Sequence, residues 1–383
     1  MTQDRSTPRI AFGNRVRKSP FFDATMRSGV KAFTVYNHMH MPAAYFTAEE
    51  EYHNLTTGVT LWDVAVERQV EIHGPDAAAF AQYLTPRNLS AMKVGQCKYA
   101  LICDEAGMVL NDPILLKLAE DRFWFSLADS DILLWAKALA FVKGFDVLVL
   151  EPDVSPLQVQ GPKSADVVRA LFGDWIDDLK YYWFREVELD GVPVVLSRTG
   201  WSSEKGYEVF LRDGSKGDWL WDRIMSVGKA FGIKPGVPNT IRRIEGGMYS
   251  VGSDFWMDAS PYELGLGRLV DLDMEADFVG KAALAEIKKA GVRKKMVGLQ
   301  WQEPRLGESN GRPWPVFQSG KSVGDLRSAV YSPRLEKNIA LAMLDADCAL
   351  SSTVTVETPA GKVDAEITSV PFYDPKKELA AGD

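Results

Sequence analysis

A ten-residue loop, Thr199 to Glu208, carries the residue types in this chain that are best suited to chemistry. Gly200 and Gly206 permit sharp turns or a close approach of the backbone to a ligand. The carboxylate of Glu208 stands where this loop enters the apolar run 209–211. At such a position it can accept two parallel hydrogen bonds from a ring that carries an amino group beside an N–H, such as a pterin or a guanine. The alternative is a solvated hairpin turn with an ordinary surface glutamate.

The charge balance and the apolar runs exclude several classes of function. The 44 basic and 52 acidic side chains give a net charge of -8, and no basic block resembles a nucleic-acid footprint, so we expect no binding to DNA or RNA. No apolar run reaches the length of about 18 residues that a membrane helix needs. Residues 1–18 also lack the apolar core of a signal peptide. We therefore expect a cytoplasmic protein.

Cysteines and histidines do not indicate a metal site. Cys97, Cys103 and Cys348 form no CxxC pair and are expected to be reduced thiols. His38 and His40 are the only close pair among four histidines, and the residues around them offer no third hard ligand. The sequence therefore predicts no metal.

The elements that must position the loop include a repeated unit. Residues 70–77 and 157–164 each read as an alternating strand, Gly-Pro and a helix start. Glycine permits the tight turn, and proline is tolerated in the first helical turn because that N–H has no partner. The repeat indicates an internal duplication and two related α+β layers.

Further strands and helices follow from the periodicity of apolar residues. Before residue 290 we predict strands at 99–103, 114–118, 122–127, 146–150, 187–189, 192–197 and 207–212, and helices at 130–142, 217–231 and 281–290. Later residues read as short strands at 296–301, 322–328, 339–344, 354–357 and 363–368, which predicts a small β-barrel or sandwich. The tail from Asp374 is expected to be frayed.

Several separated motifs in a fixed order resemble the glycine-cleavage T-protein family of tetrahydrofolate-dependent enzymes. They are Gly107–Pro113, Gly200–Glu208, Arg243–Met248, Pro261–Gly267, Asp277–Lys281 and Ser332–Ala342. The resemblance covers residues 20–372 and implies an α+β fold with three domains in a ring around a central folate cavity. It implies a discontinuous folate-binding domain (20–60 and 150–250), a second α+β domain (61–149) and a C-terminal β-barrel domain (285–373).

The resemblance also implies roles for single residues. Glu208 would hold the pterin of the folate, with Tyr207 beside it. Asp112 would lie near the reacting folate nitrogens as an ionised catalytic group, and Arg243 would contact the benzoyl-glutamate end. Two alternatives stay open: Asp112 precedes Pro113 and could form a turn, and Arg243 could pair with Glu245 or another surface acid.

Departures from the family pattern point to one branch. Aminomethyltransferases carry a Ser-His-Met run where this chain reads Ala65-Val66-Glu67, and paired aspartates where it has Asn111-Asp112. Residues 35–39, 64–71 and 111–113 are most similar to dimethylsulfoniopropionate demethylases. That resemblance implies methyl transfer from this sulfonium to N5 of tetrahydrofolate, giving methylmercaptopropionate and 5-methyltetrahydrofolate.

Methyl transfer from a sulfonium is an in-line displacement with a neutral thioether as leaving group, so it needs no metal or covalent nucleophile. Positioning of the reactants can supply up to about 7 to 11 kcal/mol. Aromatic rings attract a sulfonium by roughly 0.5 to 2 kcal/mol each, and a cationic side chain suits its carboxylate. The candidate donor-binding residues are Tyr36, Trp183, Trp201, Lys205 and Tyr207. Core packing for Tyr36 and Trp183, and a solvated turn for Lys205, remain alternatives.

The expected partners are therefore two small molecules, the folate co-substrate and the methyl donor, with a homodimer left open as the assembly. Two other functions also stay open. The chain could be another folate-dependent one-carbon transferase, such as an aminomethyltransferase or a demethylase of N-methyl or O-methyl donors. It could also bind folate without catalysis.

Overall fold

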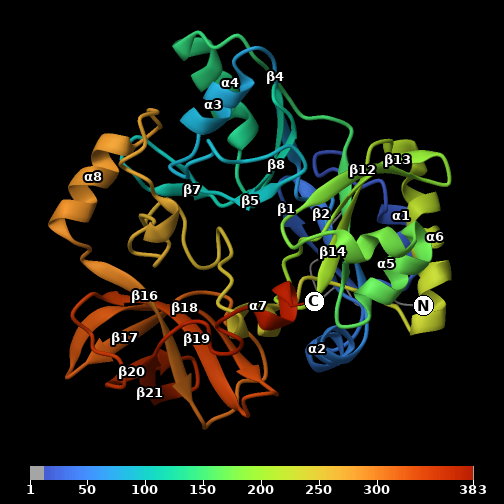
Figure 1. Ribbon diagram of the computed structural model, residues 1–383. Coiled ribbons are helices and arrows are strands. Elements are labelled where there is room, and N and C mark those ends of the chain that lie inside the picture. Colours follow the sequence, from blue (N-terminus) through green and yellow to red (C-terminus); the bar gives the residue numbers. More distant parts are fainter. Residues whose placement is uncertain (1–12, 383) are drawn as a thin grey trace.

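Three units built on β-sheets lie around a common centre (Figure 1) in residues 13–382, the part of the chain that the computed structural model describes. In Figure 1 a five-stranded sheet lies at the top, a six-stranded sheet at the right and a closed barrel at the lower left. Helices pack on the two open sheets. The predicted α+β class is confirmed.

The six-stranded sheet is covered by helices on one face. In spatial order its strands are β12 (Phe184–Leu189), β13 (Val192–Ser197), β14 (Gly206–Leu211), β11 (Ser155–Gln160), β3 (Thr60–Asp63) and β15 (Lys234–Gly236). Neighbours are antiparallel except β15 and β3. Helices α5 (Ser164–Phe172) and α6 (Gly217–Gly228) share one hydrophobic core with the sheet.

The five-stranded sheet forms the second layered unit. Its strands in spatial order are β10 (Leu148–Leu150), β4 (Gln69–His73), β9 (Arg122–Ser126), β8 (Ile114–Ala119) and β5 (Cys97–Tyr99). Helices α3 (Ala77–Tyr83) and α4 (Ile132–Lys143) contribute buried residues to its core. A separate core cluster, which includes Trp124 and Phe210, joins this sheet to the six-stranded one.

The predicted repeat is present as β4–α3 and β11–α5. Gly74 and Gly161, which follow the two strands, have φ values of 141° and 119°. A Cβ on Gly161 would lie 2.5 Å from the carbonyl oxygen of Gly58, and one on Gly74 would lie 2.7 Å from that of Asp146. Both turns therefore require glycine.

The C-terminal unit is a closed barrel, so the barrel rather than the sandwich alternative is correct. Its strands in order are β16 (Lys294–Trp301), β19 (Lys337–Asp345), β18 (Lys321–Ser332), β17 (Trp314–Gln318), β20 (Thr353–Thr358) and β21 (Gly361–Thr368). Helix α8 (Lys281–Ala290), which agrees with its predicted range, leads into it.

Smaller elements connect these units. They are α1 (Phe22–Arg27), the hairpin β1 (Ala32–Tyr36) and β2 (Met39–Ala44), α2 (Ala48–Thr57), the pair β6 (Ile102–Cys103) and β7 (Val109–Asn111), α7 (Thr240–Glu245), and the 3-10 turns Asp174–Asp178, Gly214–Lys216, Lys229–Phe231 and Gly267–Leu269. The predicted single strand at 99–103 is wrong, since it divides between β5 and β6, which belong to different sheets.

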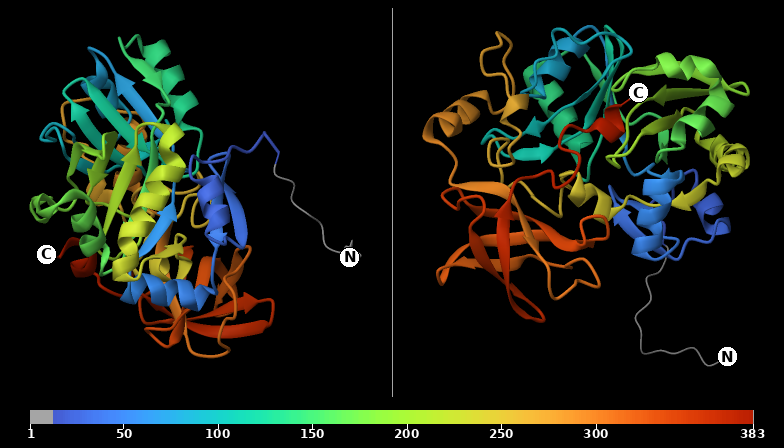
Figure 2. Two further views of the ribbon diagram at one scale, coloured as in Figure 1. Left: turned by 90° about the vertical axis from the view of Figure 1, so that its right-hand side faces the viewer. Right: turned by 60° about the horizontal axis from the view of Figure 1, so that its bottom comes forward.

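Residues 374–382 of the C-terminal tail are folded against the protein, so the expectation of fraying from Asp374 is wrong for this described part. The Asp374 carboxylate accepts hydrogen bonds from the backbone of Glu378 and Leu379 at 2.8 and 2.9 Å, at the start of α9 (Glu378–Ala381). Arg198 of the six-stranded unit donates to the carbonyl oxygen of Gly382 at 2.7 Å. Both views in Figure 2 show this red segment beside that unit. No helix within residues 13–382 is long and apolar enough to span a membrane.

Candidate functional site

Strand β14 places Glu208 on the sheet face that meets the five-stranded unit. Glu208 lies opposite Gln158 of β11 and Ser197 of β13. Because side chains alternate along a strand, Glu208 shares its face with Phe210, which packs against Trp124 of the other sheet. The site is therefore at the junction of the two sheets.

The Glu208 carboxylate is buried and held on both oxygens. Nε2 of Gln158 donates to Oε1 at 2.7 Å, and the Thr199 hydroxyl donates to Oε2. Burial raises the pKa of Glu208, and these two hydrogen bonds oppose that rise. The Ser197 hydroxyl is a third polar neighbour that lowers the pKa of Glu208, and together these groups favour the ionised form that a bidentate contact to a pterin would require.

Glu67 is a second carboxyl group at this site, and sequence reasoning did not select it. The same Nε2 of Gln158 donates to Oε1 of Glu67 at 3.2 Å, and the Ser126 hydroxyl donates to Oε2 at 3.4 Å. Burial raises the pKa of Glu67 well above its usual range, and the neighbouring charge of Glu208 raises it further. Its only signal in the sequence was the departure from the Ser-His-Met run.

Asp112 lies next to this pair. Its half-buried carboxyl accepts a hydrogen bond from the Tyr99 hydroxyl at 2.9 Å, and its charge raises the pKa of Glu67. Burial raises the pKa of Asp112 to about 7. The group therefore exchanges a proton near neutrality, whereas the sequence led us to expect an ionised carboxylate.

Tyr36 reaches the site at the end of the β1–β2 hairpin. Burial raises its pKa, the negative charges of Asp112 and Glu67 raise it further, and the ring packs against the core of the six-stranded unit. The hairpin turns at Asn37 and His38, whose φ values are 46° and 61°. The Asn37 amide donates to the carbonyl oxygens of residues 66 and 128, both at 2.9 Å. These bonds fix the hairpin to the second unit.

Asn111, where aminomethyltransferases carry an aspartate, has a structural role. Its Nδ2 donates to the Ala128 carbonyl oxygen at 2.9 Å and to Ser130 Oγ at 2.8 Å, while its Oδ1 accepts from the Ala128 N–H at 3.1 Å. An ionised aspartate has no donor. The amide is therefore needed to hold residues 128–130.

Trp201 and Arg243 lie together and connect to Glu208 through Gln158. The backbone N–H of Trp201 donates to Oε1 of Gln158 at 3.3 Å, and the Arg243 guanidinium lies 6.0 Å from the Trp201 ring centre. Arg243 pairs with buried Asp254 at 2.8 Å and donates to Ser328 Oγ at 3.0 Å. Arg243 thus pairs with an acid, as the alternative expected, but that acid is the buried Asp254 and not Glu245 or a surface group.

The structure does not bring Tyr207 and Lys205 together with Glu208. Tyr207 points to the opposite sheet face, where it is buried in the core shared with α5 and α6. The charge of Lys205 lowers the pKa of Asp177, which places the ammonium near the 3-10 turn 174–178. Half-buried Trp183 packs against the same core as Tyr207. Contacts to substrate by these three residues stay predictions.

The glycines of the loop make room for a protein side chain. A Cβ on Gly200 or Gly206 would lie 2.2 or 2.1 Å from the amide of Gln160. The Ser202 hydroxyl donates to that amide oxygen at 2.6 Å. The expected close approach to a ligand is thus replaced by a close approach to Gln160.

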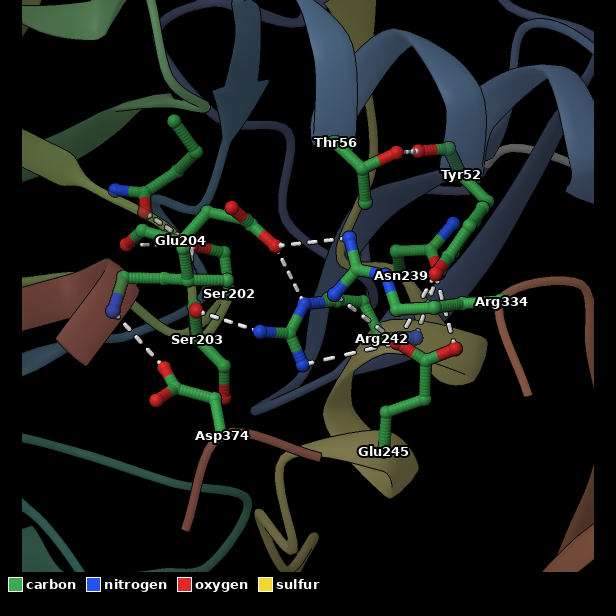
Figure 3. Close-up of polar contacts among 12 residues, drawn as sticks. Tyr52, Thr56, Ser202, Ser203, Glu204, Asn239, Arg242, Glu245, Arg334 and Asp374 are labelled. Carbon is green, nitrogen blue, oxygen red and sulfur yellow. Dashed lines mark hydrogen bonds and ion pairs between the residues drawn. The ribbon is translucent and has the colours of Figure 1, made fainter. Parts of the chain in front are cut away.

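A network of two arginines and two glutamates, all buried except the partly exposed Arg334, supports the middle of this loop at Glu204 (Figure 3). Nε of Arg242 donates to Glu204 at 2.6 Å, and the Tyr52 hydroxyl donates to Glu245 at 3.0 Å. Arg334, from the turn between β18 and β19, lies 3.8 Å from each of these glutamates. Two of the motifs identified in the sequence, residues 243–248 and 332–342, meet in this network. The network joins the loop to α7, α2 and the barrel.

Comparison with known proteins agrees with this architecture. Residues 21–274 match the GCVT N-terminal domain, and residues 294–374 match the glycine cleavage T-protein C-terminal barrel domain. The chain belongs to the glycine cleavage T-protein family. Tetrahydrofolate is the co-substrate in this family, and the chain is a folate-dependent transferase. The family resemblance predicted from the motifs is confirmed.

Two relatives differ in their named reactions. The dimethylsulfoniopropionate demethylase DmdA of Ruegeria pomeroyi is 38% identical over 350 residues, which cover 91% of this chain and 94% of that protein. An aminomethyltransferase of Bacillus cereus (strain AH187) is 30% identical over 371 residues, covering 94% of this chain and 99% of that protein.

The aminomethyltransferase T of Bartonella henselae has a similar solved structure. It superimposes with a TM-score of 0.83 at 23% identity, covering 94% of this chain and 99% of that one. The expected T-protein-like arrangement of three domains with a C-terminal barrel is confirmed.

Proposed function

We propose that this protein transfers a methyl group from dimethylsulfoniopropionate to N5 of tetrahydrofolate, giving methylmercaptopropionate and 5-methyltetrahydrofolate. The observation that carries the proposal is the 38% identity to the Ruegeria pomeroyi demethylase over nearly the whole of both chains. Glu67 and Asn111, which differ from the aminomethyltransferase pattern, support a place in the demethylase branch of the family.

In this reaction the methyl carbon–sulfur bond breaks as the N5–carbon bond forms, and the thioether leaves with the electron pair. The methylated N5 is then cationic and must release its proton. Asp112 is suited to accept this proton because its pKa of about 7 lets it exist as a carboxylate near neutrality. We therefore propose that Asp112 is the catalytic residue that accepts the proton from methylated N5.

We assign folate binding to the discontinuous unit predicted at residues 20–60 and 150–250, whose first part extends to Asp63 because β3 belongs to the six-stranded sheet. The second unit (predicted at 61–149) and the barrel (predicted at 285–373) lie next to it. Glu208 would hold the pterin, Trp201 would face the donor or the folate ring system, and Arg243 would lie toward the benzoyl-glutamate end. Tyr36, near Asp112 and Glu67, is the aromatic group best placed to contact a sulfonium. A homodimer and a cytoplasmic location remain predictions.

Formation of 5-methyltetrahydrofolate tests the proposal. The purified protein, incubated under anaerobic conditions with tetrahydrofolate and dimethylsulfoniopropionate, should form equal amounts of methylated folate and methylmercaptopropionate without a redox cofactor. A panel of N-methyl, O-methyl and aminomethyl donors tests the second candidate, which the 30% identity to aminomethyltransferases supports. Faster turnover with a panel donor would replace the sulfonium proposal, and folate binding without turnover on any donor would favour a non-catalytic role.

A further inference from the structure

Glu67 and Glu208 form a closely coupled pair of carboxyl groups. Both accept a hydrogen bond from one nitrogen, Nε2 of Gln158, at 3.2 and 2.7 Å. Two such neighbouring groups, one buried (Glu208) and one half-buried (Glu67), do not both ionise readily, so one proton is retained over a range of pH. The question is which residue carries it.

The hydrogen bonds assign the proton to Glu67. Glu208 receives the shorter bond from Gln158 and a further one from Thr199, and bonds of this kind favour the ionised form. Glu67 receives only the longer bond from Gln158 and a bond of 3.4 Å from Ser126. Both hydrogen-bond partners of Glu67 in the described part of the chain, Gln158 and Ser126, are neutral. The charged groups that shift its pKa, Asp112 and Glu208, are both acidic and raise it. Glu67 is therefore a neutral carboxylic acid beside an ionised one.

This pair complements one edge of a pterin. That edge presents the 2-amino group and N3–H as donors, followed by O4 as an acceptor. Glu208 supplies acceptors for the two donors, which leaves O4 in need of a donor. We propose that Glu67 is a specificity-determining residue that donates a hydrogen bond from its carboxyl group to O4 of the pterin. The inference rests on the proposed function, because it requires folate to bind at Glu208.

Two substitutions of Glu67 test this role by tetrahydrofolate binding, measured by calorimetry at pH 7 without a methyl donor. Glu67→Gln keeps a neutral donor and should bind folate within about threefold of the wild type. Glu67→Met removes the donor and should bind at least about tenfold less tightly, because O4 is left unpaired. If Glu67 were ionised, both substitutions would remove a repulsive charge, and tighter binding by both would overturn the proposal.

A matched control is Glu71→Gln. Glu71 is a glutamate of the same sequence run that is even more buried than Glu67, but it bonds to Arg122 and Trp124 at 2.8 and 2.6 Å. Its folded variant should keep the wild-type folate affinity. A loss of folate affinity as large as in Glu67→Met would mean that replacing either acid of this run weakens folate binding by disturbing the fold. That result would overturn a specific role for Glu67.

The 4-amino analogue of tetrahydrofolate provides a second measurement that a purely structural role would not change. It carries a donor in place of O4 and also lacks N3–H, so every variant should discriminate against it through Glu208, and wild-type protein should discriminate about tenfold more than Glu67→Met does. Glu67→Gln keeps one donor group and one carbonyl oxygen, as a neutral Glu67 does, so its discrimination should match that of the wild type within about threefold. Equal discrimination in all three proteins would overturn the proposal.

These outcomes separate the two proposals. Failure of the wild type to bind tetrahydrofolate would refute both the proposed function and the role of Glu67. The expected binding pattern without formation of 5-methyltetrahydrofolate from dimethylsulfoniopropionate would refute only the proposed donor.

Discussion

Glu67 and Glu208 are 141 positions apart in the sequence, yet their carboxyl groups accept hydrogen bonds from the same amide nitrogen of Gln158. Gln158 is the cross-strand neighbour of Glu208, and its side-chain oxygen accepts a hydrogen bond from the backbone N–H of Trp201. One buried glutamine thus sets the relative positions of the pair and of the loop that carries Trp201.

Gln158→Met should weaken tetrahydrofolate binding by about tenfold or more. The thioether fills a similar volume but leaves buried Glu208 and half-buried Glu67 without their common donor, a loss of roughly 1 to 3 kcal/mol. The measurement is the folate dissociation constant, with thermal unfolding used to verify the fold. Wild-type affinity in a folded Gln158→Met protein would show that this amide does not orient Glu208.

Asp112→Asn should be more stable than the wild type at pH 8 and equally stable at pH 4. The pKa of Asp112 is raised to about 7 by burial, so the folded state binds more protons than the unfolded state between about pH 4 and 7. The contribution of Asp112 to the unfolding free energy of the wild type therefore falls as the pH rises through that window. Asparagine does not titrate, so the variant avoids this loss. Denaturant unfolding at both pH values checks the sign, and a variant less stable at pH 8 would contradict the raised pKa.

Arg242→Met should cost about 3 to 5 kcal/mol of unfolding free energy, because it leaves Glu204 and Glu245 buried near an incomplete set of cations. The Arg242 side chain is fully buried, and it lies 3.7 Å from Glu245 as well as bonding to Glu204. Urea denaturation measures the change.

Arg305→Met is a matched control for the Arg242 prediction. Arg305 also pairs with a glutamate, Glu49, but both side chains are about half exposed. An exposed pair contributes about 0 to 1 kcal/mol. Equal losses in the two variants would contradict a special role for the buried network in Figure 3.

The sequence allowed much of the fold to be predicted where local signals dominate. Alternating strands, the two Gly-Pro turns and helix α8 follow from short-range periodicity and turn chemistry. The β1–β2 hairpin was missed because its turn uses Asn37 and His38 at positive φ, with no glycine to mark it. Strand β17 was missed because Pro315 within it reads as a loop residue.

The candidate site was only partly predictable because it depends on contacts between distant segments. Glu208 was selected from its place at a loop–strand boundary. Glu67 and Gln158 become neighbours of Glu208 only through the register of β11 against β14 and the packing of two sheets. The grouping of Tyr207 with Glu208 overlooked strand alternation, which sends adjacent side chains to opposite faces.

The most direct test of the central claim is the tetrahydrofolate affinity of Glu208→Gln. Replacing one carboxylate oxygen by an NH₂ group turns an acceptor into a donor that faces a donor of the pterin. The account predicts binding at least about tenfold weaker than in the wild type, with the variant still folded by circular dichroism. Unchanged folate affinity in that variant would contradict it.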